Sequence, residues 1–100
     1  MNIFDVSQGN VKYDNFNIDF TEPFEEQEEN LLEDLFQIEF PNNYLIDLGW
    51  YPEYEINGKI VLTLIKNYDW KNPIYKYAGV SENELKKSYE IALDIIKKGI

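Results

Sequence analysis

The stretch YLIDLGWYPEYEINGKIVLTLI, residues 44–65, decides the fold of this 100-residue chain. Its two ends, Tyr44 to Tyr51 and Ile60 to Ile65, are rich in the β-branched and aromatic residues that favour strands. Asn57-Gly58 between them is typical of a type I′ turn, because both residues tolerate positive φ angles. Pro52 lacks a backbone donor, so the first strand is expected to end or to lie at a sheet edge there. We therefore predict an antiparallel hairpin, with Trp50 in the core.

A third strand and a helix are expected after this hairpin. Ile74 to Val80 (IYKYAGV) has strand composition. Ser81 and Glu84 form a capping box, in which each side chain accepts a hydrogen bond from the other residue's backbone N–H. Apolar residues then recur at helical spacing: Leu85, Tyr89, Ala92, Leu93 and Ile96. The pattern predicts a helix from Glu82 to Lys98, with Gly99 as a left-handed C-terminal cap.

The first 43 residues show weaker patterns. Ile3 to Val6 and Phe16 to Phe20 are candidates for short strands, the second by its alternation of apolar and polar residues. From Phe24 to about Ile38, acidic residues surround an apolar stripe and favour a helix. We expect one α+β domain over residues 1–100: an antiparallel sheet of three or more strands, packed by a C-terminal helix and preceded by an acidic N-terminal helix.

Charge divides this chain into two unequal parts. Residues 1–55 contain fourteen acidic residues and one lysine, for a net charge of −13, whereas residues 56–100 carry a net charge of +3. A one-sided anionic field repels phosphate backbones and membrane surfaces and attracts basic proteins. The charge distribution therefore favours a basic protein partner, with no direct nucleic-acid or membrane binding.

The composition narrows the expected cellular compartment of the protein. The chain has no cysteine, histidine or arginine, which excludes a disulfide framework and is compatible with a reducing compartment. Its first residues show no basic region followed by an apolar run, and no stretch approaches the roughly 18 apolar residues needed to span a bilayer. We expect a cytoplasmic protein.

Few residues are suited to catalysis. Asp47, Glu53 and Glu55 are the best candidates for a carboxylate pair or for Mg²⁺ or Ca²⁺ ligands. Their spacing matches no calcium-binding loop and no glycosidase motif, and a solvated position for Asp47 on a half-exposed strand is the simpler interpretation. We therefore expect no enzyme activity, no catalytic residue, no metal and no cofactor.

Three short motifs carry a resemblance to a known family. They are Gly49-Trp50-Tyr51-Pro52-Glu53, Asn57-Gly58-Lys59-Ile60-Val61-Leu62 and Asp69-Trp70-Lys71-Asn72-Pro73. With the helical tail, residues 44–98 resemble immunity proteins of bacterial contact-dependent growth inhibition and related toxin systems. The resemblance implies a cytoplasmic antitoxin that neutralises one cognate toxin domain, often a nuclease, by blocking its active site or substrate path. It does not extend to the acidic first 43 residues and assigns no interface residue.

The candidate toxin-binding residues come from charge and aromatic character. They are Glu25, Glu26, Glu28, Glu29, Glu33, Asp34, Tyr51, Glu53, Tyr54, Glu55, Asp69 and Trp70. Acidic residues steer association with a basic partner, and tyrosine and tryptophan often anchor interfaces. A solvated helix face and a core role for the aromatics are the plainer interpretations. The alternative function is a nucleic-acid mimic that inhibits a host DNA- or RNA-binding enzyme.

Overall fold

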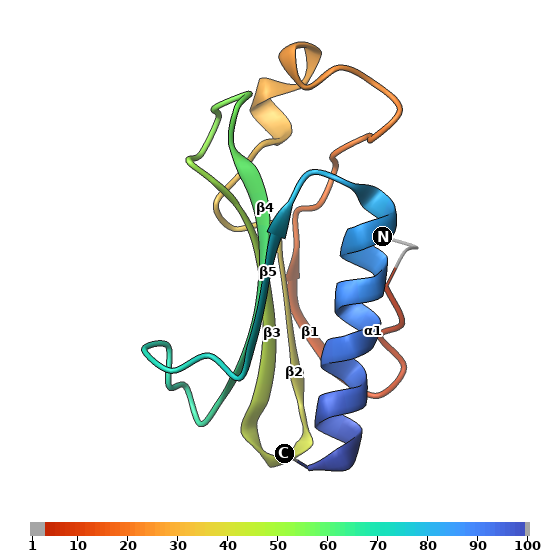
Figure 1. Ribbon diagram of the computed structural model, residues 1–100, viewed down its shortest axis with the longest axis vertical. Coiled ribbons are helices and arrows are strands. Elements are labelled where there is room, and N and C mark those ends of the chain that lie inside the picture. The colour runs from red at the N-terminus through yellow and green to blue at the C-terminus, as the bar shows by residue number, and fades with distance from the viewer. Residues whose placement is uncertain (1–3, 100) are drawn as a thin grey trace.

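The computed structural model describes residues 4–99, which form a five-stranded antiparallel sheet with one α-helix against one face (Figure 1). The strands lie side by side in chain order. The elements are β1 (Asn10–Asp14), β2 (Phe36–Phe40), β3 (Tyr44–Tyr51), β4 (Lys59–Lys66), β5 (Tyr75–Gly79) and α1 (Glu82–Lys98). This arrangement confirms the predicted α+β class, the three predicted strands of the central meander and the C-terminal helix.

The β3–β4 hairpin forms the centre of the sheet. Its register pairs Tyr44 with Lys66 and Tyr51 with Lys59, so all eight residues of each strand are matched. Alternate side chains share a face, and one face of the hairpin is buried in the core: Tyr44, Ile46, Leu48, Trp50, Ile60, Leu62 and Leu64. Trp50 is 0% exposed and donates its indole N–H to the Glu55 carbonyl at 2.7 Å. The prediction that Trp50 is a core residue is confirmed.

Helix α1 has the predicted ends. The Ser81 hydroxyl accepts a hydrogen bond from the Glu84 backbone N–H at 3.3 Å, and Gly99 caps the other end with a φ angle of 71°. The Glu84 carboxylate accepts a hydrogen bond from the Tyr77 hydroxyl rather than from the Ser81 backbone, so only half of the capping box forms. Leu85, Tyr89 and Ala92 are buried against the sheet. No helix within residues 4–99 has both the length and the apolar character required to cross a membrane.

The segment before β2 contributes residues to the core but does not form the two predicted strands. Residues 4–6 and 16–20 are irregular, and Ile3 lies outside the described residues. Phe16 and Ile18 are nevertheless buried, as their alternation suggests. The strand that pairs with the free edge of β2 is instead β1, which the sequence pattern missed.

The predicted acidic helix from Phe24 to about Ile38 does not form. Two 3-10 turns, Phe24–Glu26 and Glu28–Asn30, take the place of its first part, and the last residues belong to β2. In a helix, Glu25, Glu29 and Glu33 would follow one another at four-residue spacing, and each such like-charge pair costs about 0.2–0.5 kcal/mol. The stretch Phe36–Phe40 alternates buried and half-buried residues and pairs with β3, which outweighs its weak helical pattern.

The β3–β4 connection also differs from the prediction. Seven residues, 52–58, join the two strands. Neither Asn57 nor Gly58 has a positive φ angle, so the predicted type I′ turn is wrong; Tyr54 has one instead, at 64°. A side chain at Gly58 would meet the indole nitrogen of Trp50 at 2.5 Å. The glycine is therefore needed for close packing of the loop over Trp50 rather than for a tight turn.

Candidate functional site

The sheet has two different faces. Helix α1 covers the inner face, whereas the outer face lies between the β3–β4 loop at the upper end and the β4–β5 loop at the lower end (Figure 1). Strand register places one row of polar side chains across the outer face: Tyr13, Gln37, Asp47, Thr63 and Lys76. This face is the candidate interaction surface.

Asp47 lies at the centre of that row. Its Oδ2 atom accepts hydrogen bonds from the Gln37 amide at 2.9 Å and from the Tyr13 hydroxyl at 3.2 Å. Burial raises the pKa of the Asp47 carboxyl, and the negative charge of Asp34 adds to the shift, while the two hydrogen bonds oppose it. Burial, followed by the charges of Asp47 and Asp34, also raises the pKa of Tyr13 well above its usual range.

Tyr51 lies next to Asp47 on the outer face. A β-carbon built on Gly49 would lie 2.7 Å from Cε2 of the Tyr51 ring, so the ring lies over this glycine. Tyr51 remains 42% exposed. Its pKa is raised by burial, then by the carboxylates of Asp47, Glu33 and Asp34. Two tyrosines and the Asp47 carboxylate thus share one small region of the sheet.

The acidic segment, residues 22–34, is held against the upper end of this face. The Leu31 carbonyl accepts a hydrogen bond from the Tyr54 N–H at 2.7 Å, and the Leu32 carbonyl accepts one from the Trp50 N–H at 2.8 Å. In return, the Glu53 carboxylate accepts a hydrogen bond from the Glu33 N–H at 3.1 Å. These contacts fix the acidic segment beside the β3–β4 loop.

Gln27 organises the two acidic turns from within. Its side chain is 5% exposed and forms a two-way link with Asp19: Oε1 accepts from the Asp19 N–H and Nε2 donates to the Asp19 carbonyl, both at 2.8 Å. Nε2 also lies 3.2 Å from the Glu22 carbonyl. The neighbouring carboxylates Glu25, Glu26, Glu28 and Glu29 are all exposed. One buried amide therefore holds a loop that presents four charges to solvent.

The predicted site residues form two groups. Glu33, Asp34, Tyr51, Glu53, Tyr54 and Glu55 meet at the upper end, with Glu25, Glu26, Glu28 and Glu29 on the adjoining turns. Asp69 and Trp70 belong to the β4–β5 loop at the opposite end of the hairpin. Because β3 has eight residues, the two ends lie about 25 Å apart. The structure thus brings together ten of the twelve residues.

The β4–β5 loop closes the lower end of the outer face. The Tyr68 hydroxyl donates a hydrogen bond to the Glu39 carboxylate at 2.7 Å, and the Asn67 N–H donates one to the Asn43 carbonyl at 2.9 Å. Because Glu39, Leu45 and Ile65 are neighbours across β2, β3 and β4, the Tyr68 side chain crosses above the two apolar residues, which are buried. Trp70 remains 49% exposed.

The carboxylates at the upper end form no ion pair with another described residue. Within residues 4–99, the one ion pair joins Lys98 to Asp94 at 2.9 Å, on α1. The same part of the chain contains no cluster of three or more potential metal-ligating side chains. The charge at the upper end is therefore available to a partner rather than neutralised within the fold.

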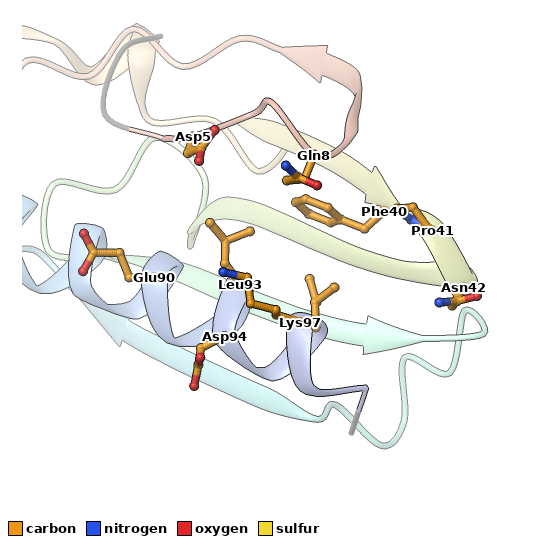
Figure 2. A pocket seen from close by; sticks show the side chains of 10 residues that line it. Asp5, Gln8, Phe40, Pro41, Asn42, Glu90, Leu93, Asp94 and Lys97 are labelled. Carbon is orange, nitrogen blue, oxygen red and sulfur yellow. The ribbon is translucent and has the colours of Figure 1, made fainter.

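The structure also contains a pocket away from the outer face. A pocket of about 520 Å³ opens between α1, the segment before β1 and the end of β2. Figure 2 shows Gln8, Phe40 and Leu93 pointing toward one another, while Asp94 points away. Asp5, Glu90 and Lys97 stand at its edges. The mixed charges of this rim select no ligand class, so the outer face remains the stronger candidate.

Three residues of the site are not evident from the sequence. Tyr13 and Gln37 were not candidates, and Asp47 was considered only for catalysis or metal binding. The alternation in Phe36–Phe40 was the available clue, because a strand there places Gln37 opposite Asp47. Tyr13 could not be found in this way, since a bulge in β1 between Val11 and Tyr13 sets its position.

Comparison with known proteins finds no matching protein family, no similar curated protein and no similar solved structure. The resemblance of residues 44–98 to immunity proteins stays a prediction.

Proposed function

We propose that this protein is a bacterial immunity protein that binds and neutralises a cognate toxin domain. The proposed partner is a basic domain of the nuclease class, whose active site or substrate path is occluded in the complex. In this proposal the protein acts in the cytoplasm, without enzyme activity, cofactor or direct contact with nucleic acid. The family resemblance of residues 44–98 and the anionic field of residues 1–55 support the proposal.

One observation carries the proposal: a fixed, carboxylate-rich surface adjoins exposed aromatic side chains. The backbone hydrogen bonds of Leu31 and Leu32 hold the acidic segment beside Tyr51 and Tyr54, which are 42% and 54% exposed. Charges of one sign accelerate association with an oppositely charged protein, whereas tyrosines that become buried supply much of the affinity. A preorganised surface also lowers the entropic cost of binding.

Binding to the toxin domain encoded beside this protein's gene tests the proposal. The two purified domains should form a complex, and the toxin's activity should fall as the complex forms. If no toxin domain encoded there binds, the proposal is wrong. If the complex forms but the toxin keeps its activity, the proposed occlusion of the active site or substrate path is wrong.

Charge reversal tests the role of the acidic turns. Replacing Glu25, Glu26, Glu28 and Glu29 by lysine should slow association about tenfold or more at low salt, with a smaller change in the dissociation rate. The effect should shrink as salt screens the charges. The double variant Glu28→Lys, Glu29→Lys is compared with Glu82→Lys, Glu90→Lys on α1, which makes the same change of charge at two exposed residues that form no ion pair with a described residue. Equal association rates for these two double variants would place the interface elsewhere.

The unpaired carboxylates also favour the second candidate, a nucleic-acid mimic that inhibits a host DNA- or RNA-binding enzyme. Glu25, Glu26, Glu28 and Glu29 present four exposed carboxylates within five residues. Such a mimic should compete with nucleic acid for several unrelated binding proteins at low salt and lose this ability at moderate salt. An immunity protein should bind one partner and tolerate moderate salt through its tyrosines.

A further inference from the structure

The outer face contains a half-buried carboxylate with one oxygen left open. Both hydrogen bonds to Asp47 reach the same atom, Oδ2. No buried side-chain nitrogen or oxygen of residues 4–99 lacks a hydrogen-bond partner, so Oδ1, which receives none, retains some exposure to solvent. No lysine within the described residues forms an ion pair with Asp47. The carboxylate is thus partly desolvated, oriented and uncompensated.

Two tyrosine rings lie near this carboxylate. The Tyr13 ring comes from β1, two strands away, and is fixed by its hydroxyl contact with Oδ2. Tyr51 comes from the same strand and the same face as Asp47, with its ring packed over Gly49, which lies between them. The Asp34 carboxylate lies close enough to affect the pKa of both tyrosines and of Asp47.

These surroundings select a cation that is planar. A partly buried carboxylate favours a positively charged partner, since removing its hydration without compensation is costly. Guanidinium groups donate several hydrogen bonds in one plane and stack on aromatic faces, and they are less strongly hydrated than ammonium groups. Arginine therefore fits a carboxylate that lies beside two tyrosine rings better than lysine does.

We propose that Asp47, Tyr13 and Tyr51 form a binding site for one arginine side chain of the basic protein partner. The guanidinium donates a hydrogen bond to Oδ1 of Asp47 and lies against the tyrosine rings, with Asp34 adding negative potential. The occupant follows from charge complementarity: the Asp47 carboxylate forms no ion pair with another described residue, and it lies near Asp34 and the acidic segment. The identity of this partner rests on the proposed function, whereas the preference of the site for arginine does not.

A purely structural role for Asp47 is the competing explanation. The carboxylate could serve only to hold the Gln37 and Tyr13 side chains. An asparagine in its place would preserve this role, because the amide oxygen also accepts hydrogen bonds. The substitution Asp47→Asn therefore removes the negative charge while leaving the hydrogen-bond acceptor, and it separates the two explanations.

A small probe tests the site without any partner. N-acetyl-arginine amide is titrated into the protein while NMR resonances of the Asp47 carboxyl carbon and the tyrosine rings are followed. Saturable shifts at Asp47, Tyr13 and Tyr51 are expected, with a dissociation constant in roughly the millimolar range. N-acetyl-citrulline amide, which has similar shape and no charge, should bind at least about tenfold more weakly, as should N-acetyl-arginine amide to the Asp47→Asn variant.

Two results of this titration would overturn the inference. One is equal affinity of N-acetyl-arginine amide for the wild-type protein and for Asp47→Asn. The other is a set of shifts centred on Glu25, Glu26, Glu28 and Glu29, with none at Asp47. Melting curves confirm beforehand that the variant is folded.

The toxin complex provides an independent second measurement. Asp47→Asn should weaken binding about 30-fold or more, mainly through faster dissociation, because a central charged contact is lost. Glu90→Gln, which removes an exposed charge on α1 on the other side of the sheet, is the matched control and should change affinity less than about threefold. A complex that forms normally with Asp47→Asn refutes the arginine site and leaves the immunity function intact. Absence of any complex with the wild-type protein refutes the immunity function, while the titration still decides the arginine site.

Discussion

The Tyr89 hydroxyl donates a hydrogen bond to the Asp5 backbone carbonyl at 2.7 Å, joining residues 84 positions apart in the chain. Tyr89 comes from the middle of α1, and its ring packs 4.6 Å from that of Phe4. Phe4 in turn lies 5.4 Å from Phe36 at the start of β2. This contact ties the segment before β1 to both the helix and the sheet.

Removing that hydroxyl should measurably destabilise the fold. Tyr89→Phe keeps the ring in the core but leaves a partly buried carbonyl without its donor, so we expect a loss of about 1–2 kcal/mol in the free energy of unfolding. Urea denaturation measures it. Tyr77→Phe is the control, because its hydroxyl bond to Glu84 is exposed, and it should cost less than about 0.5 kcal/mol. Equal losses for the two variants would show that the Tyr89 bond has no special role.

The Gln27 side chain should determine how well ordered the two acidic turns are. Gln27→Ala removes the two-way link to Asp19 and opens a gap beneath the turns, so we expect a loss of about 1–3 kcal/mol in the free energy of unfolding. Amide hydrogen exchange should rise locally in residues 19–31 even where the sheet stays protected. Gln8→Ala, at an exposed position, is the control. Unchanged exchange in the Gln27 variant would mean that the backbone bonds alone hold this segment.

The hairpin and α1 are predictable because their determinants are local. The helix bounds Glu82 to Lys98 follow from a serine cap, an apolar stripe and a terminal glycine, all within twenty residues. β3 likewise has the predicted bounds, Tyr44 to Tyr51. In both elements, local preference and tertiary burial favour the same structure.

The acidic region and the outer-face site depend on contacts that the sequence does not display. Phe36–Phe40 fits helical and strand spacing alike, and the choice comes from pairing with β3. Gln27 is polar and looks like a surface residue, yet it is buried by hydrogen bonds to distant backbone atoms. The cluster around Asp47 requires the register of three strands and a bulge beside Tyr13, so no single segment of sequence contains it.

Gly49 should be intolerant of any side chain. A β-carbon there would collide with the Glu33 backbone oxygen and lie 2.7 Å from the Tyr51 ring, so both the acidic segment and the ring would have to move. We expect Gly49→Ala to cost about 2–4 kcal/mol in unfolding free energy. At Gly79, the added carbon would meet only the hydroxyl end of the flexible Tyr77 side chain. Gly79→Ala should cost less than about 1 kcal/mol, and chemical denaturation of both variants tests the difference.

The raised pKa of Asp47 predicts that the charge proposed to bind arginine lowers the stability of the fold at neutral pH. Burial is the main cause of the shift, so between the unfolded-state and folded-state pKa values the folded protein binds more protons at this carboxyl. Its contribution to stability is therefore fully present below the unfolded-state pKa and is lost as pH rises through the folded-state pKa. At neutral pH the charged Asp47 makes the fold less stable than an uncharged residue would.

Asp47→Asn should consequently stabilise the protein at neutral pH by on the order of 0.5–1 kcal/mol, typical of relieving one unfavourable charge. The amide oxygen keeps the contacts with Gln37 and Tyr13, so no compensating loss is expected. The gain should disappear near about pH 3, where the wild-type carboxyl is protonated in both states. Urea denaturation across this pH range measures the difference, with the exposed Glu25→Gln as control. A variant that is less stable than wild type at neutral pH would mean that the hydrogen bonds to the carboxylate outweigh its burial.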